Sequence, residues 1–347
     1  MKAIRRLGAH LQPAAMAMAI GLLILAVGLE SAGYPAVPAL AALWRGAFGS
    51  PDAILSALLP RAVPLILIGL GIGIAFRGGA FNIGAEGQFY AGAIVATWVG
   101  LALSAWPRAA AVPTVLAAAT LAGMAWAAVP ALLRVRFGVL EVITTLLLNF
   151  VAESLVSWMV AGPLQEARHV YPQSDPLPLA ARLPQLPGTR LHLGLGLALL
   201  LAVGLWVMGR WTLTGLRLRA VGLNPQAAET IGGVRPFRTL AAALLASGAC
   251  AGLAGGSEVS GTTYALFQNL SPGYGFTGIA VALLARLHPL GIVLTGLLFA
   301  ALEAGAGAMQ RDAGVPAVAV YVVEAVVILT VVLSDAAARR EGGSGTV

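Results

Sequence analysis

A polar, glycine-rich stretch lies between residues 78 and 88 of an otherwise apolar region. It holds four glycines, and Phe81, Asn82, Glu86 and Gln88 stand among them. Glycine lets the backbone turn sharply and approach a ligand closely. The amide and carboxylate groups form hydrogen bonds that lipid cannot satisfy. The stretch is either a solvated loop or the lining of a cavity through which a solute passes. We favour the cavity, because an ionisable group at membrane depth usually has a function.

A second polar pattern repeats every four residues at Glu141, Thr145, Asn149 and Glu153. This spacing places the four side chains close to one face of a helix, which must turn toward the protein interior. Thr and Asn commonly hydrogen-bond neighbouring helices in membranes, and a carboxylate suits the first turn of a helix. We expect this face to order the core more than it touches a substrate.

The residue types needed for several kinds of catalysis are missing from the sequence. Lys2 is the only lysine, so no phosphate-binding loop ending in Gly-Lys-Ser/Thr exists. The four histidines form no His-Glu-x-x-His pair, and Cys250 is the only cysteine. We therefore expect a protein that is not an enzyme and that holds no cofactor or metal. Energy for any active transport must come from a partner or from an ion gradient.

The composition defines the broad class of protein. Hydrophobic residues make up 59% of the chain and charged residues only 10%, whereas soluble domains carry about 25% charged residues. The net charge of +7 does not indicate nucleic-acid binding, because the basic residues are scattered singly between apolar runs. The sequence therefore predicts an all-α, polytopic membrane protein in a lipid bilayer.

Ten apolar segments are candidates for crossing the membrane, since a spanning helix needs about 20 mostly apolar residues. They cover residues 14–29, 62–76, 83–103, 111–133, 139–162, 193–209, 239–256, 275–287, 290–309 and 316–334. We expect the first to be a retained span, not a cleaved signal peptide, and residues 1–347 to form a single transmembrane domain. Segments 62–76 and 275–287 are short and adjoin glycine-rich polar stretches, as broken helices at a substrate path do. Two inverted five-helix halves are a hypothesis.

The distribution of basic residues predicts the orientation. With the N-terminus in the cytoplasm, about twice as many basic residues fall inside as outside, in agreement with the positive-inside rule. Both termini are then cytoplasmic. The outer loop 163–191 contains six prolines, which favour an extended chain. It is either a platform for an external protein or a plain connector.

The longest predicted cytoplasmic loop covers residues 210–238. Asn224 is suited to cap a short helix that has Pro225 at its first position, and Gly232 with Gly233 can end it. Such a helix is either a docking element for a soluble partner or an ordinary loop helix.

Taken together, these stretches resemble the permease subunits of bacterial ATP-binding-cassette (ABC) importers for nucleosides and simple sugars. They are most similar to the larger permease of nucleoside (guanosine) uptake systems. The matching stretches are residues 75–88, 141–150, 218–228, 275–286 and the pair His288-Pro289, and the resemblance covers roughly residues 15–335. Glu324 departs from the pattern, where an uncharged residue is expected.

The resemblance implies a fold like that of type II ABC importer permeases in the bacterial inner membrane. It also implies three protein partners: a cytoplasmic ABC ATPase, a second and non-identical permease, and an extracytoplasmic solute-binding lipoprotein. The ATPase would contact the region that contains Arg217, Arg219, Gly222, Asn224, Pro225, Ala228 and Glu229. The substrate path would include Phe81, Asn82, Glu86, Gln88, Thr145, Asn149 and Phe276.

Two other classes of function remain open from the sequence. A secondary transporter could use Glu86, Glu303 or Glu324 as proton carriers, and a membrane scaffold would transport nothing. The substrate itself could be a nucleoside, a sugar or a flavin.

Overall fold

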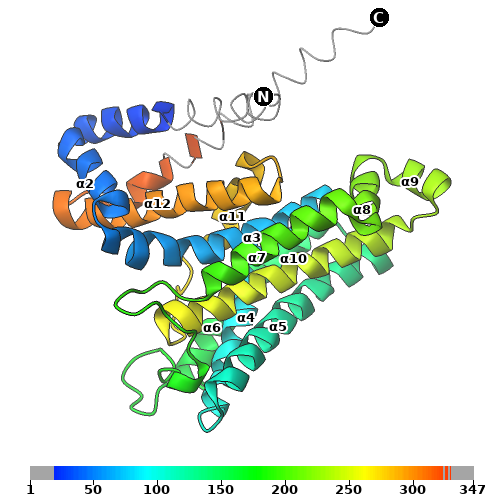
Figure 1. The fold of residues 1–347 in the computed structure, drawn as a ribbon, viewed down its shortest axis with the longest axis horizontal. Helices are drawn as coiled ribbons and strands as arrows, with labels where there is room; N and C mark the ends of the chain where they lie inside the picture. Colours follow the sequence, from blue (N-terminus) through cyan, green and yellow to red (C-terminus); the bar gives the residue numbers. More distant parts are fainter. Residues whose placement is uncertain (1–18, 323–324, 327–328, 330–347) are drawn as a thin grey trace, which may run out of the picture. The chain divides into compact units, whose positions relative to one another are not determined.

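A computed structural model describes residues 19–322, 325, 326 and 329 of the chain (Figure 1). Within these residues the chain is helical, and β-structure is limited to two isolated bridges. Glu324 and parts of the expected segments 14–29 and 316–334 lie outside the described residues. The chain divides into two compact units, one of residues 59–297 and the other of residues 1–58 with 298–347.

The unit formed by the two ends of the chain contains a helix that the sequence did not predict. α2, Ala36–Phe48, is 13 residues long and therefore too short to meet a spanning criterion. Gly46 and Gly305 allow it to approach the second half of α12, Pro289–Ala313, so closely that a Cβ atom at either glycine would collide. The remaining described elements of this unit are helix Ala19–Ser31, the π-helix Ala53–Leu58 and the 3₁₀ turn Ala317–Ala319.

The core of the unit formed by residues 59–297 is α3, Leu59–Arg77. Its residues Leu65–Ile68 are at most 1% exposed, as expected of a helix that is apolar on every side and surrounded by other helices. The segment expected at 62–76 is part of a continuous helical stretch, Ala53–Arg77, and is therefore not short.

α3 packs against α7, Gly194–Trp211, α10, Pro236–Glu258, and α11, Tyr274–Leu284. α10 also packs against α4, Ala85–Ala102. α10 crosses α5, Arg108–Phe137, at a contact between glycines. A Cβ atom at Gly123 would lie 2.6 Å from the Cα atom of Gly252, so the backbones touch. Gly248 and Gly252, four residues apart on α10, have the small-residue spacing that lets membrane helices approach closely.

The other helices of this unit are α6, Glu141–Ala161, α8, Leu213–Leu223, and α9, Pro225–Gly232. A π-helical turn, Val259–Thr263, extends α10, and the 3₁₀ turn Leu179–Ala181 interrupts the outer loop. In the described part of the chain, six helices are long and apolar enough to cross a membrane. α11, with 11 residues, is shorter.

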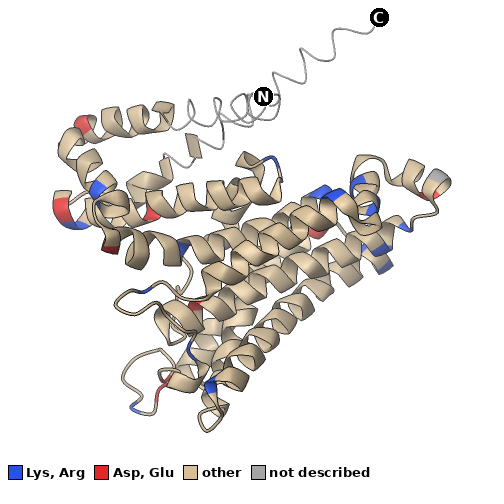
Figure 2. Cartoon of the chain, in the orientation of Figure 1, with Lys and Arg blue, Asp and Glu red and all other residues tan. Residues whose placement is uncertain are grey.

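Charged residues gather at the ends of these helices. Figure 2 shows basic residues around α8 and α9 and again at the opposite end of the same unit, with mostly uncharged helix between them. Arg77, Arg134, Arg136 and Arg210 occupy the last turns of α3, α5 and α7. This arrangement fits a multi-pass membrane protein whose apolar helix middles face lipid or each other.

Candidate functional site

α6 holds the glycine-rich loop that connects α3 to α4. The Asn149 side-chain oxygen accepts a hydrogen bond from the Gly87 N–H at 2.9 Å, and its nitrogen donates to the Ile83 carbonyl at 2.9 Å. The Thr145 hydroxyl accepts from the Ile83 N–H at 3.3 Å. The polar face of α6 therefore satisfies buried and half-buried backbone groups of this loop and of the first turn of α4.

A pair of amides closes the same loop from the inside. The Asn82 nitrogen donates to the Gln88 oxygen at 2.8 Å, and the Gln88 nitrogen donates back to the Asn82 oxygen at 3.0 Å. Asn82 also donates to the Ser247 hydroxyl of α10 at 2.8 Å. Both amides are at most 1% exposed. Their hydrogen-bonding capacity is thus largely used within the protein.

Glu141 lies at the start of α6, beside the end of α5. One carboxylate oxygen is 3.2 Å from Nε of Arg134, and the other accepts from the Phe81 N–H at 3.4 Å. Glu141 thus ties the two helices and the loop together, in agreement with the ordering role expected of this helix face.

Glu86 joins the beginnings of two helices. It lies in the first turn of α4 and accepts a 2.6 Å hydrogen bond from the Gly275 N–H in the first turn of α11. Gly275 permits this crossing, because a Cβ atom there would lie 2.6 Å from the Glu86 Cα atom. A carboxylate suits a helix N-terminus, whose N–H groups lack partners within the helix.

The structure therefore separates the expected path residues into two groups. Five are buried and bonded to neighbouring parts of the protein: Asn82, Glu86, Gln88, Thr145 and Asn149. Phe81 and Phe276 are 52% and 45% exposed. The buried group fixes the junction of α4, α6 and α11, and the two aromatic rings are the members that can meet a solute directly.

A polar cavity of about 220 Å³ opens farther along α6. Glu153 and Ser157, four residues apart, line it from α6, while Tyr90 of α4 and Asn269 complete it. The four-residue periodicity predicted that Glu153 shares a face with Asn149. However, Glu153 is exposed, and no hydrogen bond or ion pair to it occurs among the described residues. The sequence did not predict that Tyr90 and Asn269 belong to this site. The pattern that could have indicated the cavity is the pair Glu153 and Ser157, four residues apart on one helix.

The expected cytoplasmic helix forms with the caps that the sequence predicted. The Asn224 side chain accepts from the Ala227 N–H at 2.9 Å, Pro225 is the first residue of α9, and Gly233 ends it with a positive φ of 58°. Residues 213–223, expected as loop, form α8.

The expected coupling residues lie on both sides of this α8–α9 segment. Gly222 is exposed on one side but lies against the carbonyl of Arg77 on the other, and Ala228 is 7% exposed. Leu223 is 88% exposed at the junction of the two helices. The exposed members of the expected set are Arg217, Arg219, Gly222, Asn224, Pro225 and Glu229.

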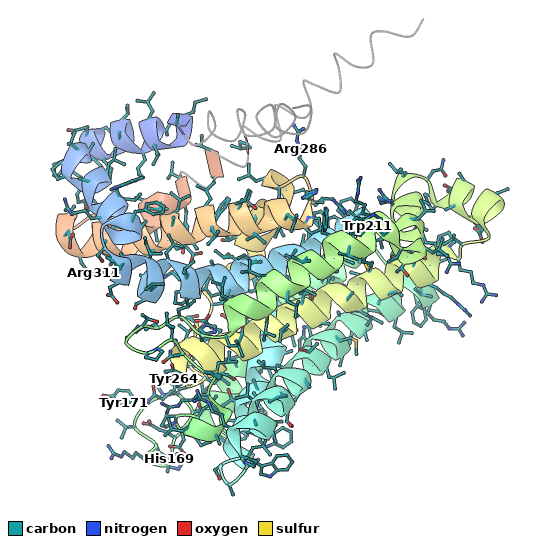
Figure 3. All side chains as sticks on the ribbon, viewed as in Figure 1. His169, Tyr171, Trp211, Tyr264, Arg286 and Arg311 are labelled. Carbon is teal, nitrogen blue, oxygen red and sulfur yellow. The ribbon has the colours of Figure 1, made fainter. Side chains whose placement is uncertain are left out.

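The proline-rich outer loop is ordered by the chain that follows α10. The N–H groups of Ser174, Leu177 and Leu183 donate to carbonyls of residues 266, 264 and 260. Arg182 lies over the Tyr264 ring, 4.5 Å from its centre. Figure 3 shows Tyr171 and Tyr264 toward one end of the unit and Trp211 toward the other. Hydrogen bonds from Gln173 and from the Tyr171 backbone lower the pKa of Glu166 in this loop.

Several known proteins are similar to this chain over most of its length. It is 40% identical over 292 residues to a glucose ABC transporter permease of Haloferax volcanii, covering 81% of this chain and 76% of that one. It is 37% identical to a guanosine ABC transporter permease of Bacillus subtilis, covering 96% of both. A nucleoside ABC transporter permease of Lactococcus lactis is 33% identical, with 90% of this chain and 88% of that one covered.

Each of these three organisms also contributes a second, more distant permease relative. No solved structure matches the chain. The family model described as "Branched-chain amino acid transport system / permease component" matches residues 54–332. The chain is therefore a transport component and not an enzyme, and it belongs to this family of permeases.

Proposed function

We propose that this chain is a permease subunit of an ABC importer and carries a nucleoside inward by alternating access. A separate ATPase subunit supplies the energy. The observation that carries the proposal is the 37% identity to a guanosine permease across 96% of both chains. The nucleoside permease of Lactococcus lactis supports the same substrate class.

The proposed assembly contains a second, non-identical permease and an extracytoplasmic solute-binding lipoprotein. The paired relatives in each of three organisms support two dissimilar permeases. The outer loop, ordered by residues 260–266, offers a firm surface for the binding protein. The permease would lie in the bacterial cytoplasmic membrane, with ten spans and both termini in the cytoplasm, as the charge bias favours.

We assign the cavity at Glu153 to the substrate path. α6 is a candidate membrane span, and exposure of a carboxylate to lipid on such a helix is costly. This face of α6 must therefore meet water or a polar partner. The carboxylate, the Ser157 hydroxyl and the Asn269 amide are suited to bind the hydroxyl groups of a sugar ring. Nucleosides and glucose share such a ring.

The buried polar residues take a supporting part in this proposal. Asn82, Gln88, Thr145 and Asn149 hold the junction beside the path, and Glu86 fixes α11 against α4. Phe81 and Phe276 are exposed beside this junction and are proposed to line the path.

The α8–α9 segment is proposed to seat in the ATPase. Capped ends make α9 a defined short helix, and an apolar side chain as exposed as Leu223 is suited to a protein partner. Gly222 would pass a displacement of this segment directly to the end of α3, whose Arg77 carbonyl it touches.

A sugar is the second candidate substrate, because the glucose permease of Haloferax volcanii is 40% identical to this chain. The ligand retained by the cognate solute-binding protein decides between the two. We expect mass spectrometry of that protein, purified without added ligand, to find a nucleoside. Retention of a hexose and no binding of nucleosides would favour the sugar.

A further inference from the structure

The ends of α3, α7 and α8 surround a basic cavity of about 440 Å³. Its charged and aromatic lining consists of Arg77, Trp206, Arg210, Trp211, Arg219 and His288. No carboxylate is among the residues that line it. His288 lines the cavity together with Arg77, and burial and this neighbouring charge lower the pKa of its imidazole. Three arginines around one cavity without a carboxylate form a site for an anion.

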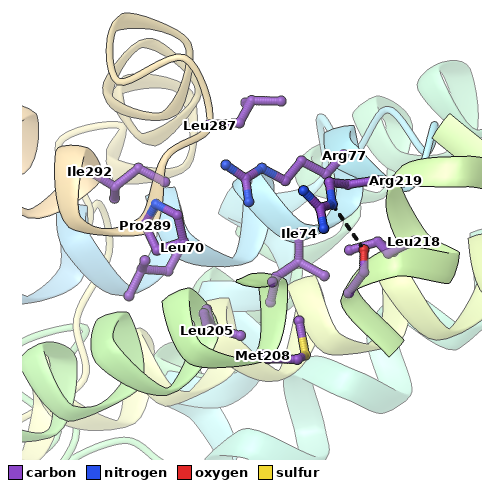
Figure 4. A pocket seen from close by; sticks show the side chains of 13 residues that line it. Leu70, Ile74, Arg77, Leu205, Met208, Leu218, Arg219, Leu287, Pro289 and Ile292 are labelled. Atoms are coloured by element: carbon purple, nitrogen blue, oxygen red, sulfur yellow. Dashed lines mark hydrogen bonds between the residues drawn. The ribbon is translucent and has the colours of Figure 1, made fainter. Parts of the chain in front are cut away.

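An apolar crevice continues from this basic mouth into the helices. It shares Arg77 and Arg219 with the mouth, and aliphatic side chains line the rest of it: Leu70, Ile74, Leu205, Met208, Leu218 and Ile292. Figure 4 shows the two arginine side chains beside one another at one end of this crevice. A 3.4 Å hydrogen bond from Arg219 to the Gly215 carbonyl holds one of them. The site is therefore amphipathic, with cations at its mouth and hydrocarbon behind them.

The position of the cavity indicates the level of the membrane surface. Arg77 and Arg210 lie in the last turns of two candidate spans, and Trp206 packs edge-on against Trp211 at the end of α7. Tryptophan is enriched where helices leave the bilayer. Only 17% of the apolar window of α7 is buried, and Leu200 and Val203 are among its exposed side chains. A lipid acyl chain can lie along this face.

We propose that this cavity binds the headgroup of an anionic phospholipid, whose phosphate meets Arg77 and Arg210 while its acyl chains follow α7. Basic pockets between helices on the cytoplasmic side are suited to such headgroups. A soluble phosphate would use the arginines but not the exposed apolar face of α7 beside them, which is why a lipid fits the whole site better.

The test compares lipid binding by the purified full-length chain and by two double variants. Native mass spectrometry in detergent titrates phosphatidylglycerol, with phosphatidylcholine as the zwitterionic reference. We expect Arg77→Gln with Arg210→Gln to weaken phosphatidylglycerol binding about tenfold or more. The matched control, Arg235→Gln with Arg238→Gln, removes the same charge from the start of α10 outside the cavity and should change binding less than about twofold.

A double variant that preserves the charge, Arg77→Lys with Arg210→Lys, distinguishes loss of the site from misfolding. We expect it to retain most of the preference for phosphatidylglycerol. Equal binding of both lipids, or equal loss in both double variants, would overturn the proposal. Displacement of the lipid by millimolar inorganic phosphate would also overturn it and assign the cavity to a soluble anion.

Discussion

Asn149 shows how one side chain can hold an irregular backbone inside a membrane protein. Its amide serves the Ile83 carbonyl in the loop before α4 and the Gly87 N–H in the first turn of α4, and both would otherwise lose their hydrogen-bond partner. The sequence indicated that this residue faces inward, because it shares a four-residue period with Glu141 and Thr145. It did not indicate that the partner would be the glycine-rich loop.

Asn149→Ala should lower the stability of the folded chain, because the Gly87 N–H and the Ile83 carbonyl lose their partner. A buried group without a hydrogen bond costs about 1–3 kcal/mol. The melting temperature of the purified chain in detergent measures this loss. Thr144→Ala is the matched control, since that exposed hydroxyl bonds only carbonyls of its own or the preceding turn. Equal melting temperatures for both variants would contradict the clamping role.

Glu153→Gln should reduce nucleoside uptake about tenfold or more while the melting temperature stays unchanged, because the carboxylate has no structural partner among the described residues. Initial uptake rates in reconstituted vesicles with the partner subunits measure the effect. Asp52→Asn, at an exposed carboxylate outside α6, is the control. Normal uptake by the Glu153 variant would remove this residue from the path.

At the scale of elements, local patterns and tertiary arrangement differ in how well they could be predicted. Asn224, Pro225 and Gly233 define α9 through short-range chemistry, so the sequence alone predicted its caps. By contrast, the rotation of α6 that buries Asn149 but exposes Glu153 depends on its packing against α4, which lies far away in the sequence. α2 was missed because its 13 residues fall below the length of a span, and its packing relies on glycines of α12.

We expect one part of the outward face of α6 to contact water and another part to contact lipid. A cysteine at position 153 should react with a membrane-impermeant, water-soluble thiol reagent, whereas one at position 158, where Trp158 is 61% exposed, should not. The native Cys250 is buried and gives a low background. Labelling followed by mass spectrometry measures both positions. Equal labelling at the two sites would mean that Glu153 does not face a path.

Leu223→Asp should prevent the ATPase from binding without affecting membrane insertion, because this side chain is 88% exposed beside α9. Co-purification of the ATPase with the permease measures the interaction. Leu179→Asp is the matched control, since Leu179 is 75% exposed in the outer loop. Stoichiometric co-purification with the Leu223 variant would show that α8 and α9 serve another purpose. Gly222 is unsuited to this test, because a side chain there would collide with the Arg77 backbone.

At the scale of the whole molecule, composition and charge bias were sufficient to predict a multi-pass helical membrane protein. Because charged residues are scarce, most of the protein surface must face lipid. The single lysine excludes the usual ATP-binding loop. Pro60 and Pro64 suggest that a helix begins near this point, so the sequence predicted a short span. In the structure the helix continues through both prolines, and α3 follows directly on a π-helix. The partner subunits and the transported solute are separate molecules, so the residues of this chain could not identify them.

Uptake by the reconstituted transporter tests the central claim most directly. Vesicles contain this chain, its partner permease, the ATPase and the solute-binding protein, and radiolabelled guanosine is the probe. We predict that uptake requires ATP and is unchanged when a protonophore collapses the proton gradient. Uptake by this chain alone, without ATP and abolished by the protonophore, would contradict the account and identify a proton-coupled carrier.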